Sequence, residues 1–261
     1  MIRLLAACLF MPILNAGEPS GEELLGAVVK ASAVRHSAVY SGRRQYSMQN
    51  RRFGKSATVE VQIASRPGEG KQFTIIHRSG SPRLISVIET LLASEADASK
   101  PGKSRTHEIS TSNYSASLLG TETVAGRDCW LLALTPKSKS KYLLKGTAWV
   151  DKSTGALVRL DGTTAANVSI WVGTPHVIEE FAPIGGVWLP VHTASKSTSL
   201  LLGESELDIQ YMDYDVNSLT LSGRGRTTGL LEHSVGRHSP NPRFSVTASA
   251  LTDLQNSVTS Q

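Results

Sequence analysis

The alternation of apolar and polar residues predicts that most of the chain is antiparallel β-sheet. Residues 58–63 read Thr-Val-Glu-Val-Gln-Ile and alternate strictly, and residues 71–77 return after a turn at 67–70. Residues 39–49 alternate more loosely and precede this pair. Strict alternation buries one face of a strand and leaves the other in water, which is typical of antiparallel sheets.

The clearest run of strands is a meander at residues 126–162. Residues 128–135 are apolar at nearly every position, which predicts a strand covered on both faces, and the basic, serine-rich residues 137–141 end it. A strand at 142–151 follows, then a turn at 152–155 in which Gly155 is free to take positive φ. Further strands are expected at 114–123, 156–161, 168–172, 177–181, 187–191 and 206–214. The total is about ten strands in hairpin order.

Two segments carry apolar residues at helical spacing instead. Ser20 and Glu23 have the spacing of a capping box, and an apolar stripe from Leu24 to Val34 follows them. Pro82 opens a second helix that extends to about residue 96. We therefore predict a mainly β (α+β) fold, in which a curled antiparallel sheet forms an unclosed β-barrel and two helices cap its concave face.

The N-terminus predicts export. Residues 1–3 are short and positive, residues 4–14 are apolar, and Ala16 precedes a plausible cleavage point, which is the layout of a secretory signal peptide at 1–16. Residues 5–8 also match a lipobox, but cleavage there leaves almost no apolar segment, so lipid anchoring at Cys8 is not expected. The remaining chain divides into a domain at 20–217 and a Ser/Thr-rich tail at 218–261, which is expected to be flexible.

Composition and charge limit the classes of partner that the protein is expected to bind. Hydrophobic residues make up 40% of the 261 and charged residues 19%, which excludes wholesale disorder. The net charge of +5 is scattered, and it suits an anionic lipid headgroup or an acidic partner. No nucleic-acid-binding module is present in the sequence, so nucleic acid is not expected as a partner.

Reaction chemistry is not indicated. The sequence has no nucleophile elbow, zinc-protease helix, phosphate loop or dinucleotide motif, so we expect a protein that is not an enzyme and has no cofactor. The seven histidines are dispersed. His176 precedes Glu179 and Glu180, but a strand puts only His176 and Glu180 on one face, too few ligands for a metal site. Cys129 lies in an apolar strand and is expected to be buried.

Several short motifs carry a family resemblance. They are Leu119-Gly120-Thr121-Glu122, Gly126-Arg127-Asp128-Cys129-Trp130, Leu134-Thr135-Pro136-Lys137, Trp149-Val150-Asp151, and Phe181 with Gly186-Val187-Trp188-Leu189-Pro190. Over about residues 22–217 the chain resembles the bacterial outer-membrane lipoprotein-sorting proteins, the LolA/LolB-like carriers, and more distantly RseB. The resemblance implies an open barrel whose apolar hollow holds acyl chains. Both Arg43 and Arg44 are candidates for the carriers' lid arginine.

The resulting hypothesis is an exported lipid- or lipoprotein-binding protein of the bacterial envelope, in the periplasm and monomeric, with a carrier or sorting role. The four tryptophans, Trp130, Trp149, Trp171 and Trp188, either pack the core or line the cavity. A shift of one residue in the alternation of a strand would place its predicted lining residues on the opposite face of the sheet, and this alternative stays open. The residues predicted to line the hollow are Val59, Val61, Ile63, Phe73, Ile75, Ile88, Leu91, Leu92, Trp130, Leu132 and Leu134.

Two alternatives stay open. The first is an envelope protein-interaction or stress-sensing module that uses the same fold and a membrane-associated protein partner. The second is a hydrolase, for which the sequence contains no motif.

Overall fold

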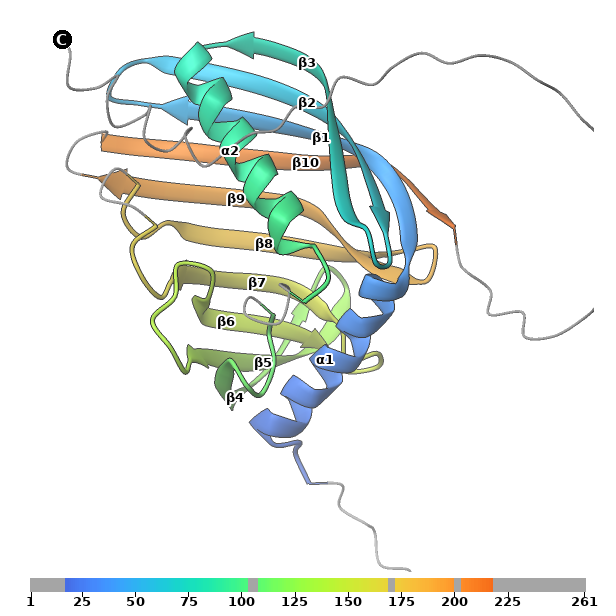
Figure 1. Cartoon of the computed structure of the whole chain (residues 1–261). Coiled ribbons are helices and arrows are strands. Elements are labelled where there is room, and N and C mark those ends of the chain that lie inside the picture. Colours follow the sequence, from blue (N-terminus) through green and yellow to red (C-terminus); the bar gives the residue numbers. More distant parts are fainter. Residues whose placement is uncertain (1–16, 103–107, 169–171, 200–202, 218–261) are drawn as a thin grey trace, which may run out of the picture. The chain divides into compact units, whose positions relative to one another are not determined.

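The ten strands in the computed structural model form one antiparallel sheet, and two helices lie on one side of it (Figure 1). The structure describes residues 17–102, 108–168, 172–199 and 203–217. The helices are α1 (Gly21–Ser37) and α2 (Pro82–Ala98). The strands are β1 (Val39–Asn50), β2 (Lys55–Arg66), β3 (Gly70–Gly80), β4 (Tyr114–Val124), β5 (Arg127–Pro136), β6 (Leu144–Asp151), β7 (Leu157–Thr164), β8 (His176–Ile184), β9 (Val187–Ser199) and β10 (Gly203–Asn217).

The strand order shows why the sheet is open. Its order is β3-β2-β1-β10-β9-β8-β7-β6-β5-β4, so β3 and β4 are its two edges. After the first three strands the chain passes through α2 on the concave side to reach β4 at the far edge, and the remaining strands return in hairpin order until β10 pairs with β1. The predicted unclosed barrel with two helices on its concave face is confirmed.

Local sequence explains both helix starts. Ser20 is the N-cap of α1: its Oγ accepts from the Glu23 N–H at 3.2 Å, and its own N–H donates to Glu23 Oε2 at 2.7 Å. This is the predicted capping box. Pro82 occupies the first turn of α2, but the N-cap Ser81 makes no side-chain hydrogen bond. The N-terminus of α2 is therefore the less firmly capped of the two.

Some boundaries differ from the predictions. β9 extends to Ser199 rather than residue 191, because its polar second half pairs with β8 on one side and β10 on the other. β6 begins at Leu144 rather than residue 142, and Tyr142 lies in the preceding turn. β5 is not fully covered on both faces: Leu132 and Leu134 are buried, but Leu131 and Ala133 on the other face are only half-buried, since both helices lie on the concave side.

Several predictions lie outside the described residues. These are the signal peptide at 1–16 with Cys8, the tail at 218–261, most of the strand expected at 168–172 with Trp171, and His107, His233 and His238. Within the described residues, neither helix is long and apolar enough to cross a membrane.

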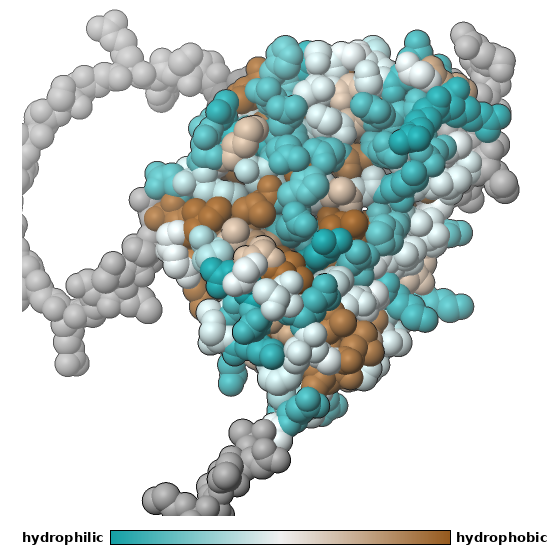
Figure 2. Space-filling view, turned by 180° about the vertical axis from the view of Figure 1, so that it is seen from behind, coloured by the Kyte–Doolittle hydropathy of each residue, from teal (hydrophilic) through white to brown (hydrophobic). Residues whose placement is uncertain are grey.

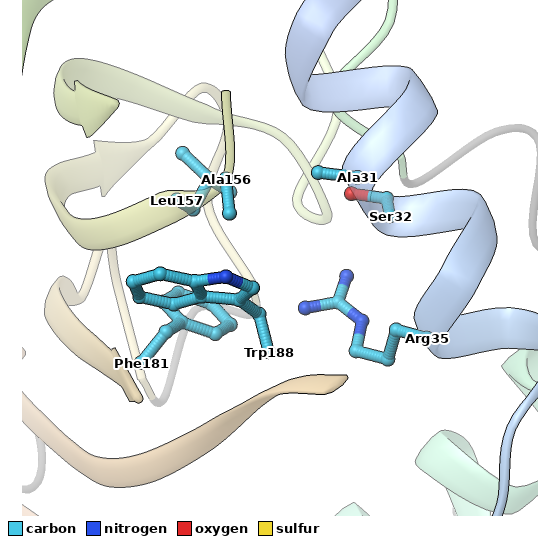
Figure 3. A pocket seen from close by; sticks show the side chains of 7 residues that line it. All are labelled: Ala31, Ser32, Arg35, Ala156, Leu157, Phe181 and Trp188. Atoms are coloured by element: carbon cyan, nitrogen blue, oxygen red, sulfur yellow. The ribbon is translucent and has the colours of Figure 1, made fainter. Parts of the chain in front are cut away.

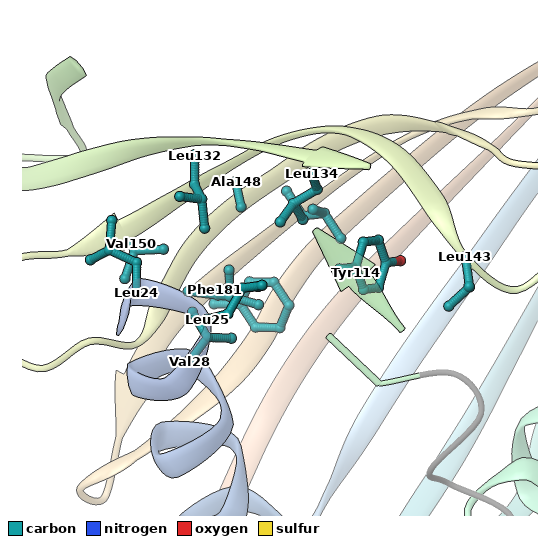
Figure 4. Packing of buried hydrophobic residues seen from close by; sticks show 12 residues of the cluster. Leu24, Leu25, Val28, Tyr114, Leu132, Leu134, Leu143, Ala148, Val150 and Phe181 are labelled. Carbon is teal, nitrogen blue, oxygen red and sulfur yellow. The ribbon is translucent and has the colours of Figure 1, made fainter. Parts of the chain in front are cut away.

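Each helix covers its own hydrophobic cluster. Under α1, Leu24, Leu25 and Val28 pack against side chains of β5, β6 and β8, among them Leu132 and Phe181 (Figure 4). Under α2, a second cluster joins β1, β2 and β10 to the helix; its buried members are Tyr46, Ala57, Val59, Val61, Ile88, Leu92 and Ile209. The two helices thus cover separate apolar regions of the concave face.

The opposite, convex face is mainly hydrophilic, with smaller hydrophobic patches (Figure 2). A row of polar contacts between charged and titratable side chains crosses four strands there. Arg159 Nη1 of β7 lies 3.7 Å from Glu180 Oε1 of β8, and His192 of β9 lies 3.6 Å from Glu180 Oε2 and 2.6 Å from Asp208 Oδ2 of β10. This face is exposed to solvent, and each such pair adds little stability by itself.

Close packing of two glycines joins β6 and β7. Gly146 and Gly162 are direct cross-strand partners, and a Cβ added to Gly146 would collide with the Asp161 carbonyl oxygen. A side chain there forces the strands apart, so Gly146→Ala is expected to lower the free energy of unfolding by about 1–3 kcal/mol. Urea unfolding followed by circular dichroism measures this change.

Gly26→Ala in α1 is the matched control. An added Cβ meets nothing within 4 Å at Gly26. Alanine is the better helix former, so this variant is expected to gain up to about 1 kcal/mol. Equal stabilities of Gly146→Ala and the unaltered protein would contradict the close pairing of β6 and β7.

Candidate functional site

The residues predicted to line a hollow all occur on α2 or on strands β2, β3 and β5, and the structure divides them between the clusters. Val59, Val61, Ile88 and Leu92 are buried beneath α2, with Phe73 and Ile75 packed against them. Leu132 and Leu134 are buried beneath α1, with Trp130 packed against them. Ile63 belongs to a third cluster with Tyr40 and Leu189. Leu91 lies outside the three clusters and is 40% exposed.

The helices fill the space in which a ligand was predicted. A cavity between α1 and strands β7–β9 has a volume of about 10 Å³ and is lined by Ala31, Ser32, Arg35, Ala156, Leu157, Phe181 and Trp188 (Figure 3). That is room for about one water molecule. A second, open depression of about 500 Å³ lies over β5–β7, but threonines, Lys145 and small side chains line much of it. Neither of these two spaces is an apolar cavity of the size that an acyl chain fills, and acyl binding by the predicted residues stays a prediction.

A partly buried ion-pair cluster lies beneath α2 beside its apolar contacts. Arg44 of β1 is 1% exposed, and its Nη1 donates to Glu95 of α2 at 2.9 Å (Oε2) and 3.1 Å (Oε1). Lys71 Nζ of β3 donates to Glu95 Oε1 at 2.7 Å. A single carboxylate on α2 is thus bound by cations from two strands. We call Arg44, Lys71 and Glu95 the latch cluster.

Aromatic rings hold the Arg44 side chain in place. The guanidinium carbon lies 5.3 Å from the centre of the Phe73 ring and 4.6 Å from that of Tyr211. Tyr46 accepts a further hydrogen bond from Nη1 at 3.2 Å. Desolvated cation–π contacts of this kind are stabilising and restrict the side chain to one orientation.

The structure distinguishes the two arginines that the sequence left open. Arg43 is exposed and pairs with Asp213 of β10, whereas Arg44 faces the concave side. Sequence reasoning missed this, although a signal was present. The large side chains Tyr40, Tyr46 and Met48 occupy even-numbered positions of β1, and Arg44 shares their parity.

The other polar residues of the concave face also share the spacing of the apolar residues on their own elements. Lys71 shares parity with Phe73 and Ile75 on β3, and Glu95 continues the helical stripe of Ile88 and Leu92. Glu179 of β8 is the direct partner of Leu160 on one side and Thr193 on the other, which places it on the concave face. Polar residues whose spacing places them on the same face as buried apolar residues are therefore the sequence signal for this site.

Burial raises the pKa of both Glu95 and Glu179, and neighbouring cations lower it, but the cations prevail at Glu95 and burial prevails at Glu179. Burial would raise the pKa of Glu95, but Lys71 and Arg44 outweigh it and hold the pKa at about 2. For Glu179 burial prevails and raises the pKa, against the opposing effect of Arg35. Within the described residues Glu179 has no hydrogen bond or salt bridge. Glu95 is therefore the fixed anion of the site.

The two helices are anchored differently. α1 buries Leu24, Leu25 and Val28, and at its start Gly21 packs against the Ala116 carbonyl of β4. α2 buries only Ile88 and Leu92. Its other bonds to the sheet are polar: Arg78 donates to Glu89 at 2.7 Å, and Ser99 Oγ accepts from the Lys71 N–H at 2.7 Å. These polar bonds add to the apolar packing of α2, to which Leu84 and Ile85 also contribute as partly buried side chains.

The remaining candidate groups do not assemble into a reactive centre. Cys129 is buried as predicted, and burial is the main cause of the raised pKa of its thiol. His176 binds Asp161 at 2.7 Å rather than Glu180. In the described part of the chain, no group of three or more His, Cys, Asp or Glu side chains is arranged to hold a metal ion.

The comparisons with known proteins return several solved bacterial structures. A DUF1329 family protein from Desulfovibrio piger is 17% identical, with 77% of this chain and 93% of that one covered and a TM-score of 0.41. A LolA superfamily protein from Nitrosomonas europaea is 16% identical (77% and 95% covered, TM-score 0.43). A putative outer membrane lipoprotein-sorting protein domain from Vibrio parahaemolyticus is 12% identical (78% and 95% covered, TM-score 0.44). The last two carry the names of the family that the sequence motifs resemble.

The comparisons with family models and with curated proteins do not identify a family for this chain. A family model described as "-like: Uncharacterized protein" matches residues 105–218, which is less than half of the chain. No curated protein matches. Because the solved structures are at most 17% identical and their TM-scores stay below 0.5, the fold rests on the sheet and helices described above.

The low pKa of Glu95 predicts how acid affects the latch cluster. A carboxyl whose pKa is about 2 when folded, against an ordinary 4.5, contributes stability above pH 4.5 and loses it as the pH falls through 2. Glu95→Gln removes this contribution and leaves Arg44 without its carboxylate. We expect a loss of about 1–3 kcal/mol at pH 7, reduced where solvent screens the partly exposed carboxylate. The difference from the unaltered protein should shrink between pH 4.5 and 2, as measured by urea unfolding at a series of pH values.

Glu89→Gln is the control on the same helix. Glu89 pairs with Arg78 in an exposed salt bridge, and we expect a change within about 0.5 kcal/mol at every pH. A constant difference between Glu95→Gln and the unaltered protein down to pH 2 would contradict the charge-paired state of Glu95.

Proposed function

We propose that this chain is an exported, non-enzymatic protein of the bacterial envelope that binds the acyl chains of lipids or lipoproteins, in a carrier or sorting role. The observation that supports this most is the way α2 is held. It covers an apolar sheet surface with two buried side chains and is fastened through the latch cluster.

The binding surface in this proposal is the concave face beneath α2. When α2 moves away, Val59, Val61 and Ile209 lose the helix that covers them, and an acyl chain replaces Ile88 and Leu92. Burial of each methylene contributes about 0.8 kcal/mol, so a long chain binds without directed bonds. Glycines with positive φ, Gly80 (φ 93°) and Gly102 (φ 84°), lie on either side of the helix and suit a hinge.

The remaining parts of the proposal come from the sequence. The predicted signal peptide supports export to the periplasm, and the motifs at 119–137 and 149–151 resemble those of lipoprotein-sorting proteins. The predicted partners are acyl chains, and a membrane-associated protein is a further candidate. The chain is proposed to act as a monomer without a cofactor.

Ligand uptake tests the proposal directly. The mature protein, purified from a bacterial periplasm and delipidated, is mixed with a diacylated lipopeptide or a phospholipid and examined by native mass spectrometry. We expect a complex with one acyl ligand. Glu95→Gln loosens α2, so it should take up ligand several-fold faster, while Glu89→Gln should behave like the unaltered protein.

The opposite result is equally clear. A mass that stays ligand-free with both ligands, in the unaltered protein and in Glu95→Gln alike, would overturn acyl binding. The protein-interaction module would then be the better proposal, because it uses the same fold without needing a ligand in the hollow.

A further inference from the structure

Among the residues that the structure describes, one edge of the Arg44 guanidinium has no hydrogen-bond partner. Nη1 is bound to Glu95 and Tyr46, but no atom among the described residues accepts a hydrogen bond from Nε or Nη2, and both are fully buried. These two nitrogens form the side of the guanidinium that donates two parallel hydrogen bonds. That side matches the paired oxygens of a carboxylate or a phosphate. A buried donor that lacks an acceptor lowers stability, so an acceptor at this edge is favoured.

The surroundings of this edge are rich in cations. Lys71 shares Glu95 with Arg44, and Arg35 of α1 lies over the Phe181 ring at 5.5 Å. Glu95 and Glu179 are acids of the same region, and Arg35, Lys71 and Arg44 all act on the titration of Glu179. Of these cations, Arg44 and Lys71 are the two that bind Glu95 directly.

Movement of α2 changes this balance. Glu95 is on α2, whereas Arg44 and Lys71 are on the sheet, so an outward movement of the helix removes the carboxylate and leaves both cations behind. Two unpaired cations at the floor of an apolar surface favour an anion that carries close to two charges. A phosphate monoester has about −1.5 to −2 charges at pH 7 and three acceptor oxygens, whereas a carboxylate or a phosphodiester carries one charge.

We propose that Arg44 and Lys71 form a binding site for the phosphate monoester headgroup of an acyl lipid, which replaces Glu95 when α2 moves outward. This inference rests on the acyl binding proposed above and specifies the ligand class. The open Nε and Nη2 edge of Arg44 binds two phosphate oxygens, and Lys71 neutralises the remaining charge. The acyl chain then lies along the apolar strands next to this site.

Two lipids that differ only in the phosphate test the site. Lysophosphatidic acid and monoacylglycerol with the same acyl chain are titrated into the mature protein by isothermal calorimetry, with inorganic phosphate as a third ligand. We expect lysophosphatidic acid to bind at least about tenfold more tightly than monoacylglycerol, as a charge-assisted hydrogen bond predicts. Inorganic phosphate should bind far more weakly than either lipid.

Arg43 supplies the matched control for Arg44. Arg44→Lys keeps the positive charge but loses the two-donor edge, so it should lower the ratio of lysophosphatidic acid affinity to monoacylglycerol affinity about tenfold, and this ratio is compared because a weaker latch affects the binding of both lipids alike. Arg43→Lys, on the neighbouring exposed position, should keep the full preference. A second readout uses the unaltered protein: the Nε resonance of Arg44 in ¹H–¹⁵N spectra should shift with lysophosphatidic acid and not with monoacylglycerol.

The outcomes separate the two proposals. If both lipids bind equally and the Nε resonance does not respond, the phosphate site is overturned and acyl binding stands. If neither lipid binds, acyl binding is overturned and the phosphate site with it. If inorganic phosphate binds as tightly as lysophosphatidic acid, the site recognises free phosphate, and the lipid headgroup assignment is overturned.

Discussion

An antiparallel sheet that curls without closing has to cover its inner face, and this requirement determines most of the structure. Ten strands present an apolar concave surface, and two helices of 17 residues each cover it. A fully closed barrel would bury the surface with its own side chains. Here the cover is a separate element, and α2 forms it within the connection that carries the chain from one sheet edge to the other. The cover and the crossing segment are therefore the same piece of chain.

The two helices meet this requirement in different ways. α1 is capped at its start, is wedged against β4 by Gly21, and buries three apolar side chains. α2 lacks a side-chain cap, buries two, and depends on Glu95 for its bond to Arg44 and Lys71. Apolar contacts are lost gradually as water enters, but a buried ion pair is stable only while both partners are in place. An interaction of that kind suits a cover with two states, closed or displaced.

The sequence predicted the elements better than the site. Strict alternation in β2 and the spacing of Ser20 and Glu23 are local signals, and both gave the correct element. The polar second half of β9 is a strand only because neighbouring strands pair with it on both sides, which no local pattern records. The link between Arg44 and Glu95 joins positions 51 residues apart, and it exists because α2 lies across β1 to β3. The pattern of apolar residues along the chain does not predict that α2 packs across these three strands.

Arg44 also shows why a charged residue on an apolar face is informative. The register irregularity between β1 and β10 near Ser41 and Arg43 comes from an extra residue in β10, and β1 pairs with β2 without a shift, so the alternation of β1 places Arg44 and not Arg43 on the concave face. The inward residue is then held by two rings and a carboxylate, an arrangement that costs more than a hydrophobic side chain of similar size would. Stability of the closed form alone does not require an arginine there. The proposed exchange of Glu95 for a ligand anion would give the buried charge a role both with α2 in place and with α2 displaced, and that is the physical argument for an arginine at this position.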